Sequence, residues 1–537
     1  MIKNIFKAIG CLSLVITAAN PTIAQENTTP ASVAKQKLEN IWINNTNNAA
    51  AGVVDAPASY SITDLSYGIT KGDFKYVQEG DDNNAIKFHT EGGGIYKKLN
   101  NMFLYGEFGY KRDKLDGVRF NASKYDPLRE MPFFLGDSTA SKWINQEYMI
   151  KMKGSTPKMF DFLTLGLSAS YTAGQAAKQI DPRPLMLMSK FEIGASVVFE
   201  LGEKHFIGLN YDYYNRREDG NASNTNNSSV PMCWDFVSPG FFTQAELDYF
   251  SALTPTRYYN ANAMGGGIQY GFKNKNWNIL LSANYMQRVE DVDTEHLDED
   301  AGPKSGNTPL KMVGTVKEDT WSGNISANYT FNNGNILALN AKYEDKSVDG
   351  IEYFQTFDNT YEIQEWIINA KYTRSNISKR AVSVKLDYVV NDGNAYKWWA
   401  GVQYANNTND WIYYIPKSFQ NTENGIYSAF VSRHIKLNED NSLTININGG
   451  FSSNGKGELQ YTGTNAENTG WTMFTLKDFN YLCTDYSKFG GEITYAFSGF
   501  KSSSMSMFAA ISFDYYKPDS DEFSKRTFTN FKIGVAF

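Results

Sequence analysis

The stretch 504–515, SMSMFAAISFDY, alternates between two kinds of side chain. One set is apolar or aromatic, and most of the residues between its members are small or polar; the apolar set is Met505, Met507, Ala509, Ile511, Phe513 and Tyr515. Period-two alternation places the two sets on opposite faces of a β-strand. Strands of soluble proteins average about five or six residues, whereas a tilted strand needs about 9–11 residues to cross a bilayer. Alternating runs of this length, which recur at 277–286 and 321–331, therefore predict membrane-crossing strands.

The same pattern over 59–537 predicts an all-β protein, a transmembrane antiparallel up-and-down β-barrel of about 20 strands, with a range of about 16–22. Short turns are expected at 100–101, 274–276 and 375–379. Longer connections are expected between them, among them 113–141, 218–261, 290–318 and 454–488. Short periplasmic turns that alternate with long extracellular loops are typical of outer-membrane barrels. Separate strands are expected at 361–374, 380–390, 396–406 and 410–416.

Residues 1–24 have the layout of a secretory signal peptide. Lys3 and Lys7 precede an apolar run at 8–19, and small residues lead to a cleavage site before Gln25. Cys11 leaves open a lipid-attached alternative, which is the weaker one because the apolar run follows the cysteine rather than preceding it. The segment is expected to be absent from the mature protein.

The sequence ends in NFKIGVAF (530–537), with Phe531, Ile533, Val535 and Phe537 at every second position. This resembles the C-terminal β-signal of Gram-negative outer-membrane β-barrel proteins. The resemblance implies insertion by the barrel-assembly machinery, contact with outer-membrane lipid and a place in the outer membrane of a Gram-negative bacterium. An ordinary last strand of a soluble β-protein is the alternative.

Residues 25–58 do not alternate and contain helix formers, so a short helix is expected there. We predict that this segment enters the lumen as a plug, with Ile41, Trp42, Asn48 and Gly52 as candidate contacts. Asn48-Ala49-Ala50-Ala51-Gly52 resembles the N-terminal hatch of long-chain fatty-acid transporter barrels, but it lacks their proline. A leader that rests below the barrel is the other reading. Two triple glycines, 92–94 and 265–267, are candidate points where the plug passes the wall, although barrel curvature also explains them.

Two predicted loops are rich in large apolar side chains. They contain Met131, Phe133 and Phe134 in one loop, and Trp234, Phe236, Phe241, Phe242, Tyr249 and Phe250 in the other. Solvated loops rarely leave so many apolar groups exposed. Three explanations stay open: the loops pack together as a cap, bind an apolar ligand, or dock a partner.

Other functions are less consistent with the sequence. The net charge of −7 disfavours nucleic acid, which needs a basic face. No cofactor or metal is expected, because the acidic residues around His296 lack the spacing of a calcium loop. Ser432 and His434 lie on one strand face but without a recognisable catalytic motif, so we expect no enzyme. Whether Cys233 and Cys483 pair is left open.

The predicted function is therefore a channel or transporter for a small solute, with an apolar solute as one option. The alternative is a scaffold barrel that does not conduct and whose outer loops bind a surface lipoprotein or another uptake or secretion partner.

Overall fold

The computed structural model describes residues 28–55, 57–221, 232–238, 241–246, 256–294, 310–358, 365–463, 467–500 and 505–537. The predicted signal peptide at 1–24, Tyr249, Phe250 and His296 lie outside the described residues.

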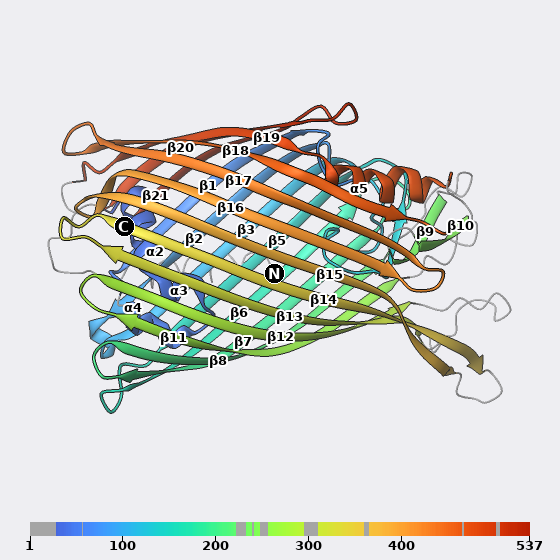
Figure 1. Ribbon diagram of the computed structural model, residues 1–537, viewed down its shortest axis with the longest axis horizontal. Helices are drawn as coiled ribbons and strands as arrows, with labels where there is room; N and C mark the ends of the chain where they lie inside the picture. Colours follow the sequence, from blue (N-terminus) through green and yellow to red (C-terminus); the bar gives the residue numbers. More distant parts are fainter. Residues whose placement is uncertain are drawn as a thin grey trace, which may run out of the picture.

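In the described residues, 18 antiparallel strands form one sheet that closes on itself (Figure 1). They are β1 (Tyr60–Gly72), β2 (Asp82–Tyr96), β3 (Met102–Val118), β5 (Ser141–Ser155), β6 (Leu163–Lys178), β7 (Leu185–Leu201), β8 (His205–Asn221), β11 (Arg257–Lys273), β12 (Trp277–Thr294), β13 (Lys311–Thr330), β14 (Ile336–Asp358), β15 (Glu365–Asp392), β16 (Ala395–Tyr413), β17 (Ser418–Lys436), β18 (Asn441–Gln460), β19 (Tyr486–Phe497), β20 (Ser506–Pro518) and β21 (Arg526–Ala536). Strand β1 pairs with both β2 and β21, so the barrel has no open edge along this seam.

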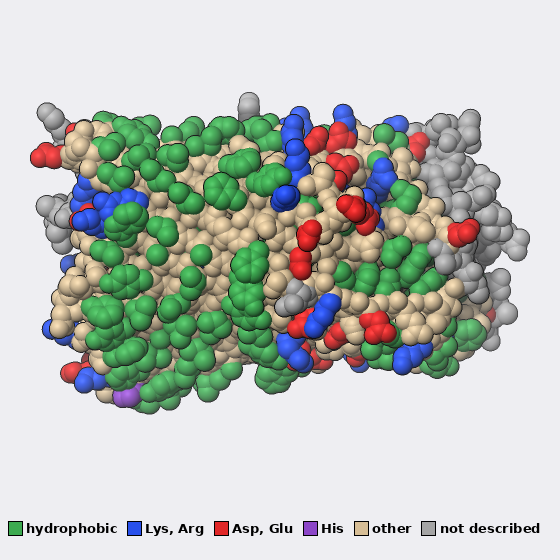
Figure 2. All heavy atoms as spheres, turned by 45° about the horizontal axis from the view of Figure 1, so that its top comes forward, with side chains coloured by type: hydrophobic (Ala, Val, Ile, Leu, Met, Phe, Trp, Pro, Cys, Tyr) green, Lys and Arg blue, Asp and Glu red, His purple; other side chains and the backbone are tan. Residues whose placement is uncertain are grey.

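The two faces of the wall differ as the alternation predicts. Along β21, Phe531, Ile533 and Val535 belong to the outward set, and the Ile533 side chain is 60% exposed. The inward set carries polar side chains such as Lys532 and Asn530, on the face that encloses the lumen. Hydrophobic side chains gather over a broad region of the outer surface, and charged side chains gather beyond it (Figure 2). This apolar belt is the surface expected of a wall that faces lipid. Within the described residues, no helix is long and apolar enough to cross a membrane.

The strand number is 18 rather than about 20, because two predicted turns are not turns. Residues 375–379 lie inside β15, where Asn376 pairs with Asp349 and Ile412 on the two neighbouring strands. The predicted break at 407–409 lies inside β16 in the same way. Both stretches are mostly polar because they sit beyond the apolar belt, where the outward face of a strand needs no apolar residues; Ile377 points inward to the cap. Their composition therefore imitates a turn while the ladder of hydrogen bonds continues.

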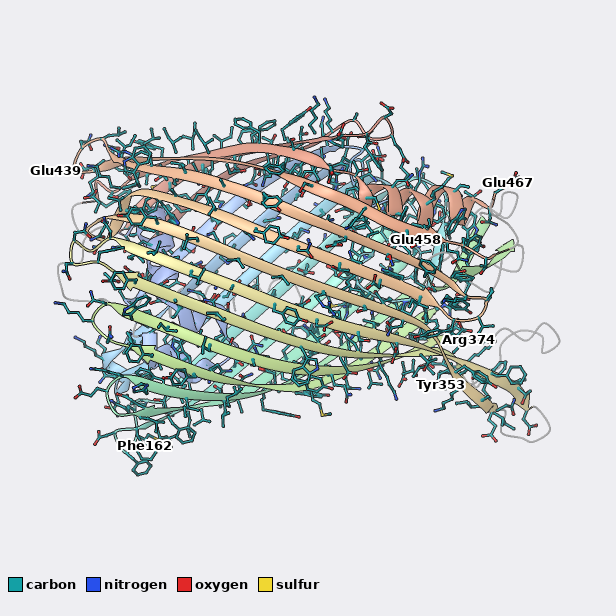
Figure 3. The ribbon with its side chains drawn as sticks, viewed as in Figure 1. Phe162, Tyr353, Arg374, Glu439, Glu458 and Glu467 are labelled. Carbon is teal, nitrogen blue, oxygen red and sulfur yellow. The ribbon has the colours of Figure 1, made fainter. Side chains whose placement is uncertain are left out.

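The two ends of the barrel differ in their connections. One end, here called the turn end, carries short links such as 274–276 and 437–440, with Glu439 at its edge (Figure 3). The opposite end, called the loop end, carries the long connections, and several strands continue well beyond the apolar belt there. The longest are β14 and β15, whose hairpin projects past the rim near Tyr353 and Arg374 (Figure 3).

Both ends of the lumen hold further elements. Near the turn end lie α2 (Pro30–Glu39), α3 (Ile41–Asn45), the 3-10 helix η1 (Ala49–Ala51) and α4 (Gly52–Asp55), inside the barrel (Figure 1). Near the loop end lie a small sheet of β4 (Phe134–Asp137), β9 (Met232–Ser238) and β10 (Phe241–Glu246), and the π-helix η4 (Trp471–Thr475) with α5 (Leu476–Cys483). A further 3-10 helix, η2 (Lys97–Leu99), lies in the link between β2 and β3.

A matched pair of substitutions tests which face meets lipid. Val402 points outward and is 56% exposed, and the next residue, Gln403, is exposed on the lumen face of the same strand. We expect Val402→Lys to lower the free energy of unfolding in lipid vesicles by about 2–4 kcal/mol, because it places a charge in hydrocarbon. Gln403→Lys is the control and should change the denaturant titration little. Equal losses in the two variants would contradict the assignment of the faces.

Candidate functional site

The segment 28–55, here called the plug, is tied to the lumen wall by polar contacts. Lys37 forms an ion pair with Glu91 of β2. The Nζ of Lys35 donates to the Oδ1 of Asn391 at 2.6 Å, and the Nδ2 of Asn48 donates to the Oε1 of Gln269 at 2.9 Å. The plug therefore bonds to strands from widely separated parts of the wall. A neutral hydrogen bond such as that of Asn48 stabilises by about 0.5–1.5 kcal/mol, and one to a charged group such as Lys35 by about 1.5–3 kcal/mol.

The centre of the plug is Trp42, whose side chain has no exposed surface. Its ring packs edge-on against Phe206, with 6.4 Å between ring centroids, and it shares a core with Ile41. On the wall beneath it lies Gly271, where an added Cβ would stand 2.3 Å from the Trp42 ring. The sequence analysis selected Ile41, Trp42 and Asn48, and the structure brings all three to this interface.

Glycines of the wall provide the space for the plug. An added Cβ at Gly166 would lie 2.1 Å from the backbone nitrogen of Ala50. Conversely, Gly52 belongs to the plug, and an added Cβ there would meet the Phe103 ring at 2.1 Å. The triple glycines do not serve this purpose: Gly265, for example, faces the backbone oxygen of Tyr285 on the neighbouring strand. Sequence alone could not distinguish these isolated glycines from others in the strands.

The aromatic residues of the two predicted loops meet in one core at the loop end. Phe134 stacks on Phe236 with 4.6 Å between centroids, and both contact Phe474 of η4. Trp234 joins them and donates its indole N–H to the Oδ1 of Asn468 at 2.8 Å. We call the assembly of loops 73–81 and 119–137, β9, β10, η4 and α5 the cap.

The remaining selected loop residues also pack into the protein. Met131 and Phe133 are buried against the inner wall, in a cluster that includes Ile377. Phe241 stacks on Tyr413 at 4.2 Å, and Phe242 packs against Phe236. Most of the described apolar side chains of these loops are therefore packed within the cap, the first of the three explanations. Met131 and Phe134 also border a cavity beneath the cap.

Arg129 anchors the cap inside the lumen. Its guanidinium contacts the Glu290 carboxylate at 2.6 Å and the Glu218 carboxylate at 3.2 Å, and both carboxylates are fully buried. It also lies 4.8 Å from the centre of the Tyr259 ring. Arg288 and Arg216 complete the network by pairing with the same two glutamates. Loop 119–137 is thus folded into the barrel mouth and held there by charge.

Two adjoining cavities lie between the cap and the inner wall. The larger, of about 330 Å³, is lined by Phe74, Tyr76, Glu344, Lys379, Arg380, Ala381, Asn407, Asn409, Asn424, Ile426, Tyr481, Leu482, Thr484 and Tyr486. The smaller, of about 170 Å³, shares Tyr76, Lys379, Asn409 and Leu482 with it. We call the two together the chamber. Its residues come from loops 73–81 and 119–137, from η4 and α5, and from five strands of the wall, so no single stretch of sequence could reveal it.

Several ionisable cap residues near the chamber have shifted pKa values. Burial raises the pKa of the Asp478 carboxyl to about 7, although that group accepts a hydrogen bond from the Val77 N–H at 2.7 Å. Burial likewise lowers the pKa of Lys124 to about 7. Burial opposes ionisation of Glu130 too, but Lys379 and Lys346 overcome it and hold its pKa at about 2. The charge of the cap therefore changes near neutral pH through Asp478 and Lys124.

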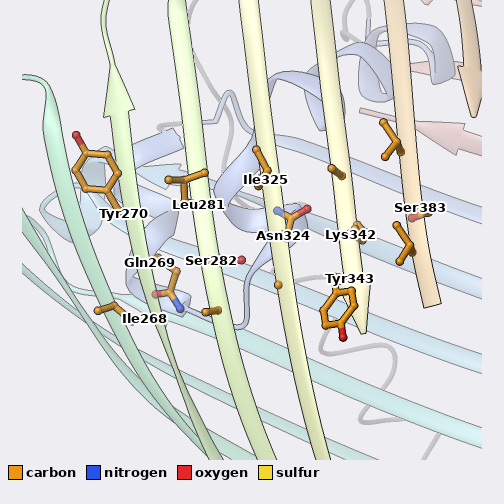
Figure 4. A pocket seen from close by; sticks show the side chains of 15 residues that line it. Ile268, Gln269, Tyr270, Leu281, Ser282, Asn324, Ile325, Lys342, Tyr343 and Ser383 are labelled. Atoms are coloured by element: carbon orange, nitrogen blue, oxygen red, sulfur yellow. The ribbon is translucent and has the colours of Figure 1, made fainter. Parts of the chain in front are cut away.

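A larger hollow, of about 550 Å³, lies on the outward side of the wall across β11 to β15 (Figure 4). Its outward side chains include Ile268, Leu281, Ile325 and Tyr343, all exposed, with Gly323 leaving space between them. Because it is part of the apolar belt, we assign it to contact with lipid rather than to a soluble ligand.

The structure does not form a catalytic pair from Ser432 and His434. Ser432 bonds to the Tyr396 hydroxyl at 2.9 Å, and His434 bonds to Thr444 at 2.9 Å. Among the described residues, no group of three or more His, Cys, Asp and Glu side chains is arranged to hold a metal ion. Cys233 and Cys483 are both free thiols. That the protein is not an enzyme stays a prediction.

Residues 49–537 match a family of unknown function, DUF6850, and the chain therefore belongs to that family. No curated protein matches the sequence. The fatty-acid transporter resemblance finds no support in these results.

Among solved structures, the chain is similar to the copper transporter OprC, with 8% identity, a TM-score of 0.39, and coverage of 88% of this chain and 80% of that one. It is also similar to BauA, the ferric preacinetobactin receptor from Acinetobacter baumannii, with 9% identity, a TM-score of 0.38 and coverage of 89% and 80%. The outer membrane transporter YddB from Escherichia coli gives 8% identity, a TM-score of 0.38 and the same coverage. These are distant likenesses.

Removal of Arg129 should release the cap. In Arg129→Leu, Glu290 and Glu218 each lose a buried partner, and breaking a buried ion pair costs about 3–5 kcal/mol. We expect loop 119–137 to become sensitive to protease while the barrel stays intact. Lys142→Ala, which removes an exposed ion pair with Asp116, is the control. Unchanged proteolysis of the Arg129 variant would contradict the anchoring role.

The attachment of α5 should weaken as the pH rises. The Asp478 carboxyl ionises near pH 4 when exposed and near pH 7 in the cap. Between about pH 4 and pH 7 the released cap thus binds fewer protons at Asp478 than the attached cap, so the contribution of Asp478 to stability falls with rising pH across that window. Lys124 acts above about pH 7 and in the opposite direction. Calorimetry should show the cap transition moving to lower temperature across this range. In Asp478→Asn the shift should be smaller; an identical shift would assign the effect to other groups.

Proposed function

We propose that the protein is a gated outer-membrane barrel for uptake of a small solute in a Gram-negative bacterium. The turn end would face the periplasm and the loop end the exterior. The observation that carries the proposal is that the plug occupies the turn end of the lumen while the cap occupies the loop end. The plug is the element that must move for a solute to cross, and the cap restricts access to it from the loop end.

The attachments of the plug favour a gate over a permanent seal. Besides the Trp42 core and a second apolar cluster of Ala31 and Leu38 with the wall, the plug is held by separate polar contacts. Examples are those of Lys35, Lys37 and Asn48. Water or a passing solute can replace each of them. An apolar solute, one option from the sequence, receives less support, because the apolar cap residues contact one another.

A scaffold that holds a surface partner is the second candidate, and the β14–β15 hairpin supports it. Beyond Glu352 and Arg374 the two strands pair only with each other in the described part of the wall. The projecting part exposes large side chains, including Phe354, which is 62% exposed, and Tyr372. Such a hairpin is marginally stable alone, so a surface lipoprotein that adds to it is a reasonable partner. We also propose that the barrel-assembly machinery binds the C-terminal strand β21.

Planar bilayer recordings distinguish the two candidates. We expect the full chain to be silent and a chain without residues 25–56 to give steady single-channel current. Gly271→Ala should give intermittent openings, because its methyl group displaces Trp42 without altering the plug sequence.

Gly106→Ala is the matched control on the wall, since an added Cβ there has no atom within 4 Å. It should behave as the full chain does. Heat-dependent mobility on gels shows that each preparation is folded. If the folded deletion variant and folded Gly271→Ala both give no current, transport is rejected and the scaffold is favoured.

A further inference from the structure

The chamber combines aromatic rings on one side with amide side chains on the other. The aromatic side comes from the cap, where the Tyr481 ring lies 4.9 Å from the Phe74 ring and 4.7 Å from the Tyr76 ring, centre to centre. Tyr486 extends this cluster, 5.5 Å from Phe74. Ring faces carry partial negative charge and attract C–H groups with partial positive charge, such as those of a sugar ring.

The facing side is built by β16 and β17. The Nδ2 of Asn407 donates to the Oδ1 of Asn424 at 3.3 Å, and the Nδ2 of Asn409 donates to Thr422 at 3.4 Å. Each amide has two N–H donors and a carbonyl with two lone pairs, so these single bonds leave hydrogen-bonding capacity directed at the chamber. Glu344 adds a carboxylate that accepts hydrogen bonds.

The charges around the chamber balance. Glu130 contacts Lys379 at 2.5 Å and Lys346 at 3.6 Å, so one carboxylate is shared between two ammonium groups. Glu344 offsets the remaining positive charge.

Lys124 and Asp478 contribute one basic and one acidic group to the smaller cavity. Arg129 and Arg380 are each paired with carboxylates outside the chamber. An anion or a cation would therefore find no excess of opposite charge here. An apolar ligand would cover the amides and leave them unpaired, which costs free energy.

Resting on the proposed uptake function, we infer that the chamber binds a short, uncharged saccharide. Its hydroxyl groups satisfy the amides of Asn407, Asn409 and Asn424, and its ring C–H faces pack on Tyr76 and Tyr481. The larger cavity, about 330 Å³, is at the lower end of the range of about 300–1,000 Å³ found for ligand pockets. The chamber therefore suits one or two sugar rings and not a long chain.

Isothermal titration calorimetry on the full chain tests this inference, in a detergent without a sugar headgroup. The probes are maltose, cellobiose and N,N′-diacetylchitobiose, with citrate, choline and decanoate as charged and apolar comparisons. We expect saturable binding of at least one disaccharide and none of the comparison compounds. Asn407→Ala should weaken that binding about tenfold or more, since the sugar loses hydrogen bonds in a confined site.

Asn406→Ala is the matched control, because the adjacent residue lies on the opposite face of β16. It should bind as the wild type does. Asn409→Ala provides a second chamber variant in case Asn407→Ala fails to fold.

The inference is overturned if no disaccharide binds to either the wild type or Gly271→Ala, if a comparison compound binds instead, or if Asn406→Ala and the chamber variants lose binding equally. Conductance separates this result from the proposed function. If the variants conduct but no saccharide binds, the proposed transport function stands and the saccharide ligand is rejected. If a saccharide binds but no variant conducts, the binding site stands and the transport function is rejected.

Discussion

The pairing of backbone N–H and C=O groups in a medium without water determines most of this structure. An unpaired group in hydrocarbon costs several kcal/mol, so a sheet that crosses lipid must close. Closure here depends on the register of β1 with β21, in which Leu65 lies opposite Ile533 and both point outward. The alternation of the side chains follows from the same constraint, because a closed wall has one face in lipid and the other around the lumen.

Once the wall is closed, the lumen becomes a separate environment with its own requirements. It is lined by polar and charged side chains, and the two elements that enter it are held differently. The plug is attached by individual polar contacts and by two apolar clusters, one around Trp42 and one at Ala31, whereas the cap combines an aromatic core with the buried charges around Arg129. The cap is thus the more strongly fixed of the two, and the chamber lies on its inner side. With the chamber at the loop end and the gate at the turn end, a solute that enters from the loop end meets the binding site before it meets the gate.

The sequence predicted the wall well and the interior less completely. Period-two patterning located the strands of the wall, and it failed there where strands leave the apolar belt, as at 375–379, because polar residues on both faces resemble a turn. It also missed β4, β9 and β10 of the cap, which lie in predicted loops. The apolar loop residues were recognised, but their mutual packing could not be separated from ligand binding before the loops were placed together. Trp42 and Asn48 were selected as plug contacts from a local pattern. Gly271, Arg129 and the chamber amides were missed, since each acts through residues remote in sequence.

The seam also has a consequence for the order of folding. Most strands pair with their neighbour in sequence, so hairpins such as β11–β12 require only short-range contacts. The pairing of Ile62 with Ala536 joins opposite ends of the wall, and the loop-closure entropy of this contact is the largest in the barrel. Contacts of such long range form slowly. Until that pairing forms, the first and last strands each present a free edge and an apolar face. The open intermediate is therefore the species most prone to aggregate and the one that most needs a chaperone before it inserts into the membrane.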